Sequence, residues 1–258
     1  MKVLILGGTT EGSAIARALM GDGRFLPVLS LAGRTRAPVL PGVDGRRVAG
    51  RRGGFGGVAG LVAYLRDEGV GALVDATHPF ARVISGNAAA AARAAGVARV
   101  AVWRPGWVAE AGDDWAVVPD MGAAVAALGQ VARRVFLTVG QQELGPFFDG
   151  GGAAPWHDYL VRSVEPPDAG VLPEGVRYLA ARGPFLVEDE VRLLRDEGIG
   201  VVVTKNSGGE ATRAKLVAAR RLGIPVVMVA RPPEPEGPVV GDVAGVLDWL
   251  HQVLERGV

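Results

Sequence analysis

The chain has 258 residues, 49% of them hydrophobic, which is enough to bury one large or two small cores. Its 28 basic and 27 acidic residues give a formal net charge of +1, so composition favours neither a nucleic-acid partner nor a membrane surface. There is no cysteine, and the three histidines, His78, His157 and His251, lie far apart in sequence, so we expect no protein-ligated metal.

No apolar run approaches the ~18 to 20 residues of a membrane span, and Met1-Lys2 leads into a strand rather than a signal peptide. We therefore expect a cytoplasmic protein with a small-molecule partner, working as a monomer or a homodimer.

Short β-branched runs alternate with stretches of helical periodicity. The first series predicts strands at Val3–Leu6, Leu26–Leu31, Ala72–Val74 and Arg99–Val102, and helices at Ser13–Met20, Val58–Arg66 and Arg82–Ala95. The second predicts strands at Val135–Val139, Tyr159–Val164, Arg177–Ala180, Gly200–Thr204 and Pro225–Val229, and helices at Ala123–Leu128, Phe185–Glu197, Ala211–Leu222 and Val243–Glu255.

The continuous apolar strands are typical of parallel sheets covered on both faces, so the fold class is α/β with two units. The irregular stretch Arg104–Asp120 is the best linker candidate. We place the domains at residues 1–112 and 113–258.

The first predicted strand breaks directly into a glycine turn and a helix, a junction whose backbone N–H groups and helix dipole suit phosphate. The dinucleotide fingerprint G-x-G-x-x-G is met at its first and third glycines, with a threonine at the second. The same turn also suits a strand-to-helix connection without a ligand. The cofactor candidates here are Gly7, Gly8, Thr9, Thr10, Glu11 and Gly12.

After the second predicted strand, the acidic residue expected for the ribose of NAD is missing. Ser30, Gly33 and Arg34 stand there instead, a hydroxyl and a guanidinium that suit a 2′-phosphate. This favours NADP over NAD, although Arg34 also fits a plain surface arginine.

A glycine-rich connection precedes the next helix and contains Gly54, Phe55 and Gly56. It permits close approach of backbone to a ligand, and it equally describes a flexible loop.

The strand Ala72–Val74 is followed by Asp75, Thr77, His78 and Pro79. Pro79 fits a first helical turn that Thr77 or His78 would cap. This loop also lies at the carboxyl edge of the sheet, where a histidine can donate a proton near neutral pH. We therefore take Asp75 and His78 as catalytic candidates and Thr77 as a cofactor contact.

A second strand, polar glycine loop and helix start appear at Lys205, Asn206 and Ser207, and the following helix carries Arg213 and Lys215. A lysine and backbone amides at a helix N-terminus suit a carboxylate or a phosphate, and an ordinary solvated turn is the alternative.

The ordered set of motifs resembles the precorrin-6A reductases of cobalamin biosynthesis over nearly the whole chain. The matching motifs are Ile5–Gly12, Ala32–Thr35, Gly53–Gly57, Asp75–Ala81, Thr204–Gly209 and Gly223–Val227. The least recognisable resemblance is in residues 104–175.

The resemblance implies two Rossmann-like domains with an interdomain cleft, and an enzyme that uses NADPH, with NADH as the alternative, to reduce a double bond of a tetrapyrrole. It implies that the glycine loop Gly54–Gly56 approaches the flat macrocycle. The substrate carboxylates would then bind to Lys205, Asn206, Ser207, Arg213 and Lys215. A cobalt-containing and a metal-free macrocycle remain equally open.

Two other functions fit parts of the sequence. A non-catalytic NADP-binding sensor has no need for the second glycine loop with its lysine. A short-chain reductase would carry a Tyr-x-x-x-Lys pair, which none of Tyr64, Tyr159 and Tyr178 begins.

Overall fold

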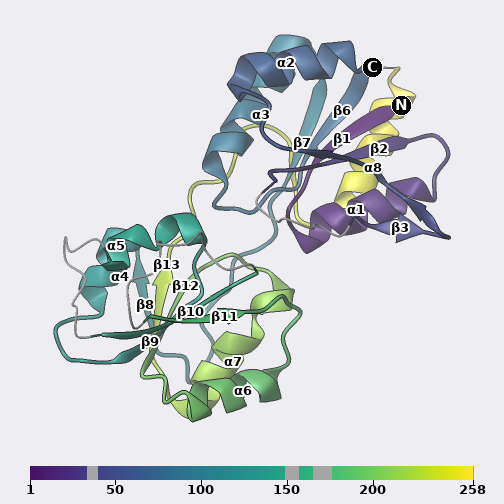
Figure 1. Cartoon of the computed structure of the whole chain (residues 1–258). Helices are drawn as coiled ribbons and strands as arrows, with labels where there is room; N and C mark the ends of the chain where they lie inside the picture. Colours follow the sequence, from purple (N-terminus) through teal and green to yellow (C-terminus); the bar gives the residue numbers. More distant parts are fainter. Residues whose placement is uncertain (34–39, 149–156, 165–175, 258) are drawn as a thin grey trace. The chain divides into compact units, whose positions relative to one another are not determined.

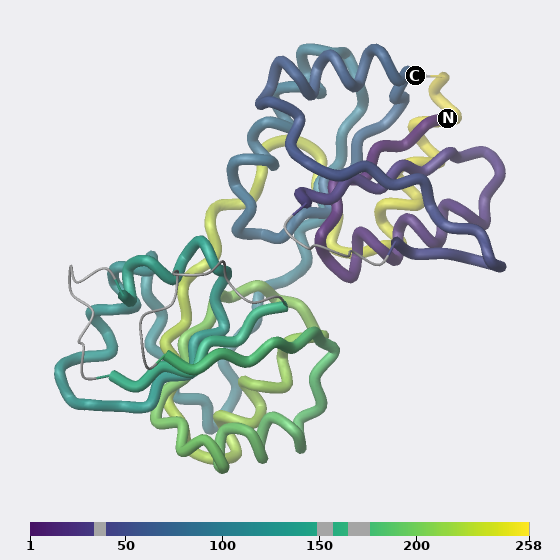
Figure 2. The backbone as a smooth tube through the Cα atoms, in the orientation of Figure 1, coloured from purple at the N-terminus to yellow at the C-terminus, as the bar shows by residue number. Residues whose placement is uncertain are grey.

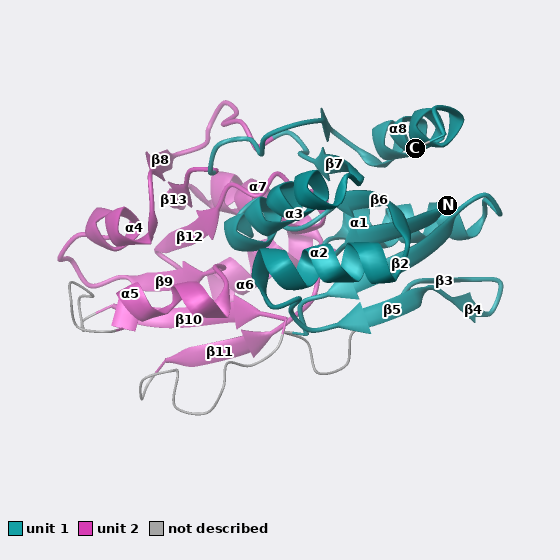
Figure 3. Cartoon of the chain, turned by 90° about the horizontal axis from the view of Figure 1, so that it is seen from above, with its two compact units in different colours: residues 1–105, 232–258 teal, residues 106–231 magenta. Residues whose placement is uncertain are grey.

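The computed structural model describes residues 1–33, 40–148, 157–164 and 176–257. Within these residues the chain forms two compact units, the first built from Met1–Pro105 together with Pro232–Val258 and the second from Gly106–Arg231 (Figure 3). The backbone can be followed out of the first unit after Pro105 and back into it after Arg231 (Figure 2). The predicted division between residues 112 and 113 differs in two ways, because the first segment of unit 1 already ends at Pro105 and the C-terminal segment from Pro232 returns to that unit.

The first unit is a six-stranded parallel sheet with helices on both faces (Figure 1). Its elements are β1 (Lys2–Leu6), α1 (Thr10–Met20), β2 (Leu26–Leu31), the hairpin β3 (Gly42–Val43) and β4 (Arg46–Arg47), β5 (Ala49–Arg52), α2 (Gly57–Asp67), β6 (Val70–Asp75), α3 (Arg82–Ala95), β7 (Ala98–Val102), β14 (Val239–Val240) and α8 (Val243–Glu255).

The strand order in this sheet is β5-β2-β1-β6-β7-β14. In chain order this is 3-2-1-4-5-6, the doubly wound arrangement of dinucleotide-binding domains. The order reverses between β1 and β6, so the loops that follow these two strands flank the crevice where such sheets bind ligands.

Alternation along β1 explains the two layers of the core. Val3 and Ile5 pack with α1 and α8, whereas Leu4 and Leu6 pack with α2 and α3. All four side chains are buried, as expected for a parallel strand covered on both faces.

The second unit is another six-stranded parallel sheet, in the order β11-β10-β9-β12-β13-β8. Its elements are β8 (Trp115–Val118), α4 (Met121–Ala127), β9 (Arg134–Leu137), the 3₁₀ turn η1 (Gln141–Glu143), α5 (Gly145–Phe148), β10 (Asp158–Ser163), β11 (Arg177–Ala180), α6 (Val187–Asp196), β12 (Val201–Lys205), the 3₁₀ turn η2 (Glu210–Thr212), α7 (Ala214–Leu222) and β13 (Val226–Val229). Here the order reverses between β9 and β12.

The α/β class with mainly parallel sheets is confirmed, and two local predictions need correction. The expected linker Arg104–Asp120 contains β8, which pairs with β13 at the edge of the second sheet. The helix expected from Ala211 begins at Ala214, after the separate turn η2.

Candidate active site

The turn after β1 is tied to both neighbouring strands. The backbone N–H of Gly7 donates to the Ser30 carbonyl of β2 at 2.9 Å. Thr9 caps α1, because its Oγ1 accepts from the N–H of Gly12 at 3.1 Å, and it also donates to the carbonyl of Ala76, just after β6, at 2.7 Å. The turn is therefore fixed across the point where strand order reverses.

Three positions of this turn require glycine, for different physical reasons. A Cβ on Gly7 would lie 2.6 Å from Cδ1 of Leu29, and one on Gly12 would lie 3.2 Å from the Gly7 Cα, so both allow close packing. Gly8 has φ +111°, a conformation that L side chains rarely adopt, and no heavy atom would lie within 4 Å of its Cβ. The space beside Gly8 is open.

Thr10 and Glu11 occupy the first turn of α1. Thr10 donates to Glu11 Oε2 at 3.1 Å, and Arg104 Nη1 pairs with the same oxygen at 2.6 Å in a partly buried ion pair. Glu11 is therefore held by Arg104 at the helix N-terminus, where an acid is stabilised by the dipole.

At the end of β2, Ser30 is buried and its hydroxyl accepts a hydrogen bond from Arg51 Nη1 at 3.2 Å. Gly33 follows with φ +80°, and its Cβ would lie 3.5 Å from the N of Gly53. Arg34 lies outside the described residues. Arg51, at the end of β5, was missed from the sequence because an arginine in an arginine-rich chain gives no local signal.

The residues expected to meet the macrocycle after β5 are engaged in local contacts. The Gly54 carbonyl accepts from Arg51 Nη2 at 2.7 Å. The Phe55 ring packs edge-on against Tyr64, with centroids 5.2 Å apart, and Gly56 has φ +80° immediately before α2. These contacts give Phe55 a packing role, and the approach of this loop to the substrate stays a prediction.

Asp75, the last residue of β6, is only 3% exposed and fully engaged. Its Oδ1 accepts from the Thr77 hydroxyl at 2.7 Å, and its Oδ2 pairs with Arg99 Nη2 at 3.1 Å. The Thr77 hydroxyl also lies 3.1 Å from that of Ser85, and Arg99 donates to the Glu236 carbonyl at 2.9 Å. Asp75 therefore orients its neighbours, and its direct role in catalysis stays a prediction.

His78 is half-buried on the loop between β6 and α3. Its Nδ1 accepts from the backbone N–H of Phe80 at 3.3 Å, and the two rings lie 5.8 Å apart. The helix begins at Arg82 with Ala81 at the N-cap, so neither His78 nor Thr77 caps it. In the neutral imidazole, an accepting Nδ1 leaves the proton on Nε2.

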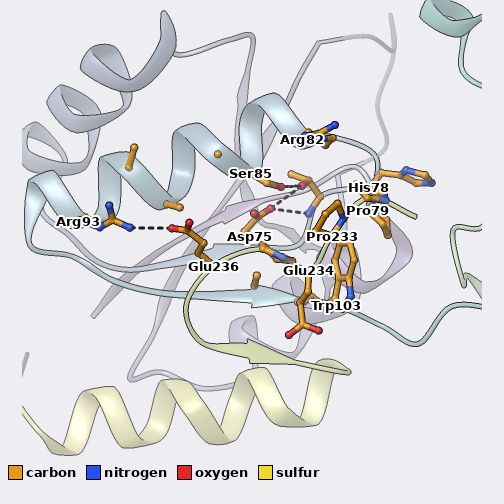
Figure 4. Close-up of a pocket in the computed structure, with 18 residues that line it drawn as sticks. Asp75, His78, Pro79, Arg82, Ser85, Arg93, Trp103, Pro233, Glu234 and Glu236 are labelled. Atoms are coloured by element: carbon orange, nitrogen blue, oxygen red, sulfur yellow. Dashed lines mark hydrogen bonds and ion pairs between the residues drawn. The ribbon is translucent and has the colours of Figure 1, made fainter. Parts of the chain in front are cut away.

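A pocket of about 380 Å³ lies within the first unit beside this loop. Asp75, Thr77, His78, Arg82, Ser85, Trp103 and the returning segment Pro232–Glu236 contribute to its lining. Figure 4 shows these side chains gathered between α3 and the returning segment, with Arg93 and Glu236 paired at one end. The pocket thus brings together three of the predicted residues, Asp75, Thr77 and His78.

In the second unit, Lys205 ends β12 at the reversal point of that sheet. Its Nζ contacts Glu143 Oε1 at 2.7 Å and Oε2 at 2.6 Å, and Oε2 also accepts from the N–H of Gly140 at 2.7 Å. A Cβ on Gly140 would lie 2.5 Å from that oxygen. Glu143 was missed, although the strand, glycine and polar residues that precede it repeat the pattern seen after β1 and β12.

Asn206 and Ser207 turn inward. The Asn206 side chain accepts from the Trp107 N–H at 2.7 Å and donates to the Trp107 carbonyl at 2.8 Å, so it fixes the segment that enters the second unit. Ser207 is buried. Asn206 therefore has a structural role, and the substrate contacts of Asn206 and Ser207 stay predictions.

Arg213 and Lys215 do not join Lys205. Arg213 forms an ion pair with Glu110, so its charge is compensated. Lys215 is 3% exposed, donates to the Thr212 carbonyl at 2.8 Å and lies 4.9 Å from the Trp107 ring centroid. Burial lowers the pKa of Lys215 to about 7. A buried ammonium cannot meet a substrate carboxylate at the surface, which corrects that expectation.

Comparison with known proteins places this geometry in a family. The model of the precorrin-6x reductases CbiJ/CobK matches residues 2–251. The chain belongs to the precorrin-6x reductase family. A solved structure of CobK precorrin-6A reductase shares 49% identity and aligns with a TM-score of 0.90, covering 98% of this chain and 97% of the other.

Members of the precorrin-6x reductase family differ in how similar they are to this chain. The precorrin-6A reductase of Rhodobacter capsulatus is 49% identical, covering 100% of this chain and 99% of its own. The cobalt-precorrin-6A reductase of Methanothermobacter thermautotrophicus is 30% identical, covering 98% of this chain and 85% of its own.

Among the residues described, no helix of this family member is long and apolar enough to cross a membrane. The same residues contain no cluster of His, Asp and Glu that could hold a metal ion.

Proposed function

We propose that this chain reduces one carbon–carbon double bond of precorrin-6A to give the 6B form, using NADPH, as a step in cobalamin biosynthesis. Membership of the reductase family supports the reaction. The metal-free macrocycle is supported by identity, which is 49% to the relative from Rhodobacter capsulatus named precorrin-6A reductase and 30% to the Methanothermobacter relative named for the cobalt form.

The turn between β1 and α1 fits the pyrophosphate of a dinucleotide, and this is the observation that carries the cofactor proposal. Gly8 leaves open space beside the backbone, and Gly7 and Gly12 bring strand and helix close together. The backbone N–H groups in the first turn of α1 and the helix dipole would hold the phosphates. Thr9 keeps the turn in place through Ala76, across the switch point.

NADPH, when bound, supplies a hydride for an electrophilic carbon of the conjugated macrocycle. The protein must then orient that carbon and deliver a proton to its neighbour. His78 borders the pocket, and as an imidazolium it would donate a proton through Nε2, whereas the contact of Nδ1 with the Phe80 N–H belongs to the neutral form. Thr77 would contact the cofactor from the same loop, held in place by Asp75.

Lys205 would bind a carboxylate of the tetrapyrrole at the switch point of the second unit. Lys205 and Glu143 lie there as a partly buried pair, with the lysine side chain 13% exposed. A substrate carboxylate would compete with Glu143 for the same ammonium.

The experiment that tests this function follows the absorbance of NADPH with the purified chain. We expect oxidation only when precorrin-6A is present, together with a product heavier by two hydrogen atoms. Binding of NADPH without oxidation in the presence of the tetrapyrrole would contradict the enzyme and support the alternative, a non-catalytic NADP-binding sensor.

A further inference from the structure

A group of buried charges lies in the second unit where β10, α6 and α7 meet. Arg162 of β10 forms a bidentate ion pair with Glu190 of α6, at 2.5 Å and 2.8 Å, and Lys215 is in the first turn of α7. Less than a tenth of each of these residues is exposed. Two cations therefore share one acid, and both oxygens of that acid are already bound by Arg162. Burial and, to a smaller extent, repulsion from Arg162 lower the pKa of Lys215 to about 7.

The other charged side chains around Lys215 are compensated or exposed. Arg213, on the same helical turn, pairs with Glu110 of the segment that enters the second unit. Glu210 of η2 is exposed to solvent. The proton of Lys215 is therefore not matched by a second buried acid among the described residues.

Lys215 contacts both ends of the loop after β12, which comprises residues 206–209. Its Nζ donates to the carbonyl of Thr212 in η2 at 2.8 Å and lies 4.9 Å from the centroid of the Trp107 ring. The backbone of Trp107 is joined to the first residue of the loop by two hydrogen bonds with the Asn206 side chain. Lys215 thus meets the end of the loop through Thr212 and its start through Trp107.

The closed position of Trp107 also leaves a polar group unsatisfied. The residue is 9% exposed, and its Nε1 is buried without a hydrogen-bond partner among the described residues. A buried N–H without an acceptor costs free energy that contact with water restores. Both the Trp107 indole and a protonated Lys215 therefore gain hydration when this part of the unit opens.

We propose that Lys215 is a proton switch for the loop after β12, because protonation of its amine favours a state in which Trp107 and η2 have moved aside and Lys215 meets water. In the open state Lys215 titrates as a free lysine, with a pKa of 10.5, against about 7 in the closed state. The ratio of open to closed chains therefore rises by up to about tenfold per pH unit as the pH falls from 10.5 toward 7, and stays constant below. This loop follows Lys205, and the switch does not depend on the reaction that the chain catalyses.

Thiol labelling measures this opening, because the chain has no cysteine and a single one can be introduced. Ala214→Cys places a thiol next to Lys215, at a position that is 6% exposed. Dividing its labelling rate at each pH by that of an unstructured peptide with the same local sequence gives the ratio of open to closed chains. We expect this ratio to rise close to tenfold per pH unit between pH ~9.5 and ~7.5 as the pH falls. Adding Lys215→Met should make the ratio independent of pH.

Two further measurements separate local opening from unfolding of the whole unit. Ala218→Cys lies one turn further along α7 in the core, fully buried, and should react about 100-fold more slowly than Ala214→Cys. Fluorine NMR of the chain labelled with 5-fluorotryptophan needs no cysteine. The Trp107 signal, assigned by its loss in Trp107→Phe, should shift more between H₂O and D₂O as the pH falls, while that of Trp249 in α8 keeps a constant response.

Each outcome supports or overturns the switch. A labelling ratio for Ala214→Cys that does not change with pH, or that changes equally after Lys215→Met, would overturn it. Equal rates for the cysteines at 214 and 218 would assign the opening to unfolding of the whole unit and overturn it as well. If the cysteine variants do not fold, the fluorine signal decides, and a Trp107 solvent response that is the same at all pH values rejects the proposal.

Discussion

His78 is the residue whose role in proton transfer can be separated from its role in the loop. His78→Asn keeps an acceptor for the Phe80 N–H, because asparagine makes the same local turn, but removes the imidazole. We expect single-turnover reduction to fall by about 100-fold or more, the usual loss for a general acid, with little change in melting temperature. A rate within about threefold of wild type would assign the proton to water instead.

Mutations of Lys205 and Glu143 should change the KM for the tetrapyrrole in opposite directions. Lys205→Met should raise the KM for the tetrapyrrole about tenfold or more, through loss of a charged contact, with little change in the KM for NADPH. Glu143→Gln keeps an acceptor for Gly140 but removes the competing charge, so the same KM should fall. If both variants raise the KM for the tetrapyrrole, the ion pair only stabilises the loops after β9 and β12, and Lys205 does not bind a substrate carboxylate.

Because Lys215 is buried, the stability of the folded chain should increase with pH. Its pKa of about 7 in the folded chain lies below the value of 10.5 for a free lysine, so the unfolded chain binds more protons between these pH values. Stability therefore rises with pH across this window, and the full cost of burial applies below it. Lys215→Met should stabilise the chain at pH ~7 by a few kcal/mol and flatten this dependence.

Urea unfolding at several pH values measures this effect. Lys2→Met, which removes the same charge at the surface, is the control and should leave the slope with pH unchanged. A less stable Lys215→Met variant at neutral pH would show that the contacts with Thr212 and Trp107 outweigh the cost of desolvation.

At the scale of elements, a mutation in the turn between β1 and α1 should remove cofactor binding without preventing the chain from folding. Gly8→Val places a side chain in the open space beside the backbone and strains a residue at φ +111° by about 1–3 kcal/mol. We expect NADPH binding to be lost while the far-ultraviolet circular dichroism stays near wild type. Gly23→Ala, in a turn with equally open space and no positive φ, is the control. Normal NADPH binding by Gly8→Val would make the turn purely structural.

Elements with strong local signals could be predicted from the sequence, and elements defined by distant partners could not. The bounds of β2, α3, β11 and α8 agree with the sequence, because apolar periodicity and capping are local. In contrast, β5 has the sequence AGRR, without an apolar run, and it is ordered as an edge strand against β2. The same reason hides Arg51, whose importance comes from Ser30, 21 residues earlier in the chain.

The candidate site was predictable to a similar extent. The turns after β1 and β6 were found because glycine, proline and polar residues follow apolar strands. The burial of Lys215 was missed, since its polar neighbours in sequence resemble a solvated helix and only the tertiary fold places Trp107 beside it. The partner of Lys205 was missed for a related reason, because Glu143 comes from the other side of the switch point.

At the scale of the whole molecule, the first unit depends on residues from both ends of the sequence. The strand β14 completes its sheet by pairing with β7, and α8 packs against α1. A parallel strand followed by a helix suits either sheet, so the pattern alone could not assign the last residues to the first unit. The second unit is therefore an insertion between β7 and β14.

This connectivity predicts different effects of two C-terminal truncations. Ending the chain after Arg231 removes α8, whose Val246 and Leu250 are fully buried in the core of the first unit. Each such side chain contributes about 1.5–3 kcal/mol, and with β14 and Val253 the loss is comparable to the whole stability of a domain. We expect the shortened chain to lose NADPH binding and the cooperative melting of the first unit.

The control truncation ends after Glu255 and removes only residues beyond α8. It should keep NADPH binding and lower the melting temperature by no more than a few degrees, since surface residues usually contribute within about 0.5 kcal/mol. Differential scanning calorimetry with and without NADPH distinguishes the two chains, because a ligand raises the melting temperature only of a unit that folds and binds it. NADPH-dependent stabilisation of the chain that ends at Arg231 would show that the first unit folds without its returning segment.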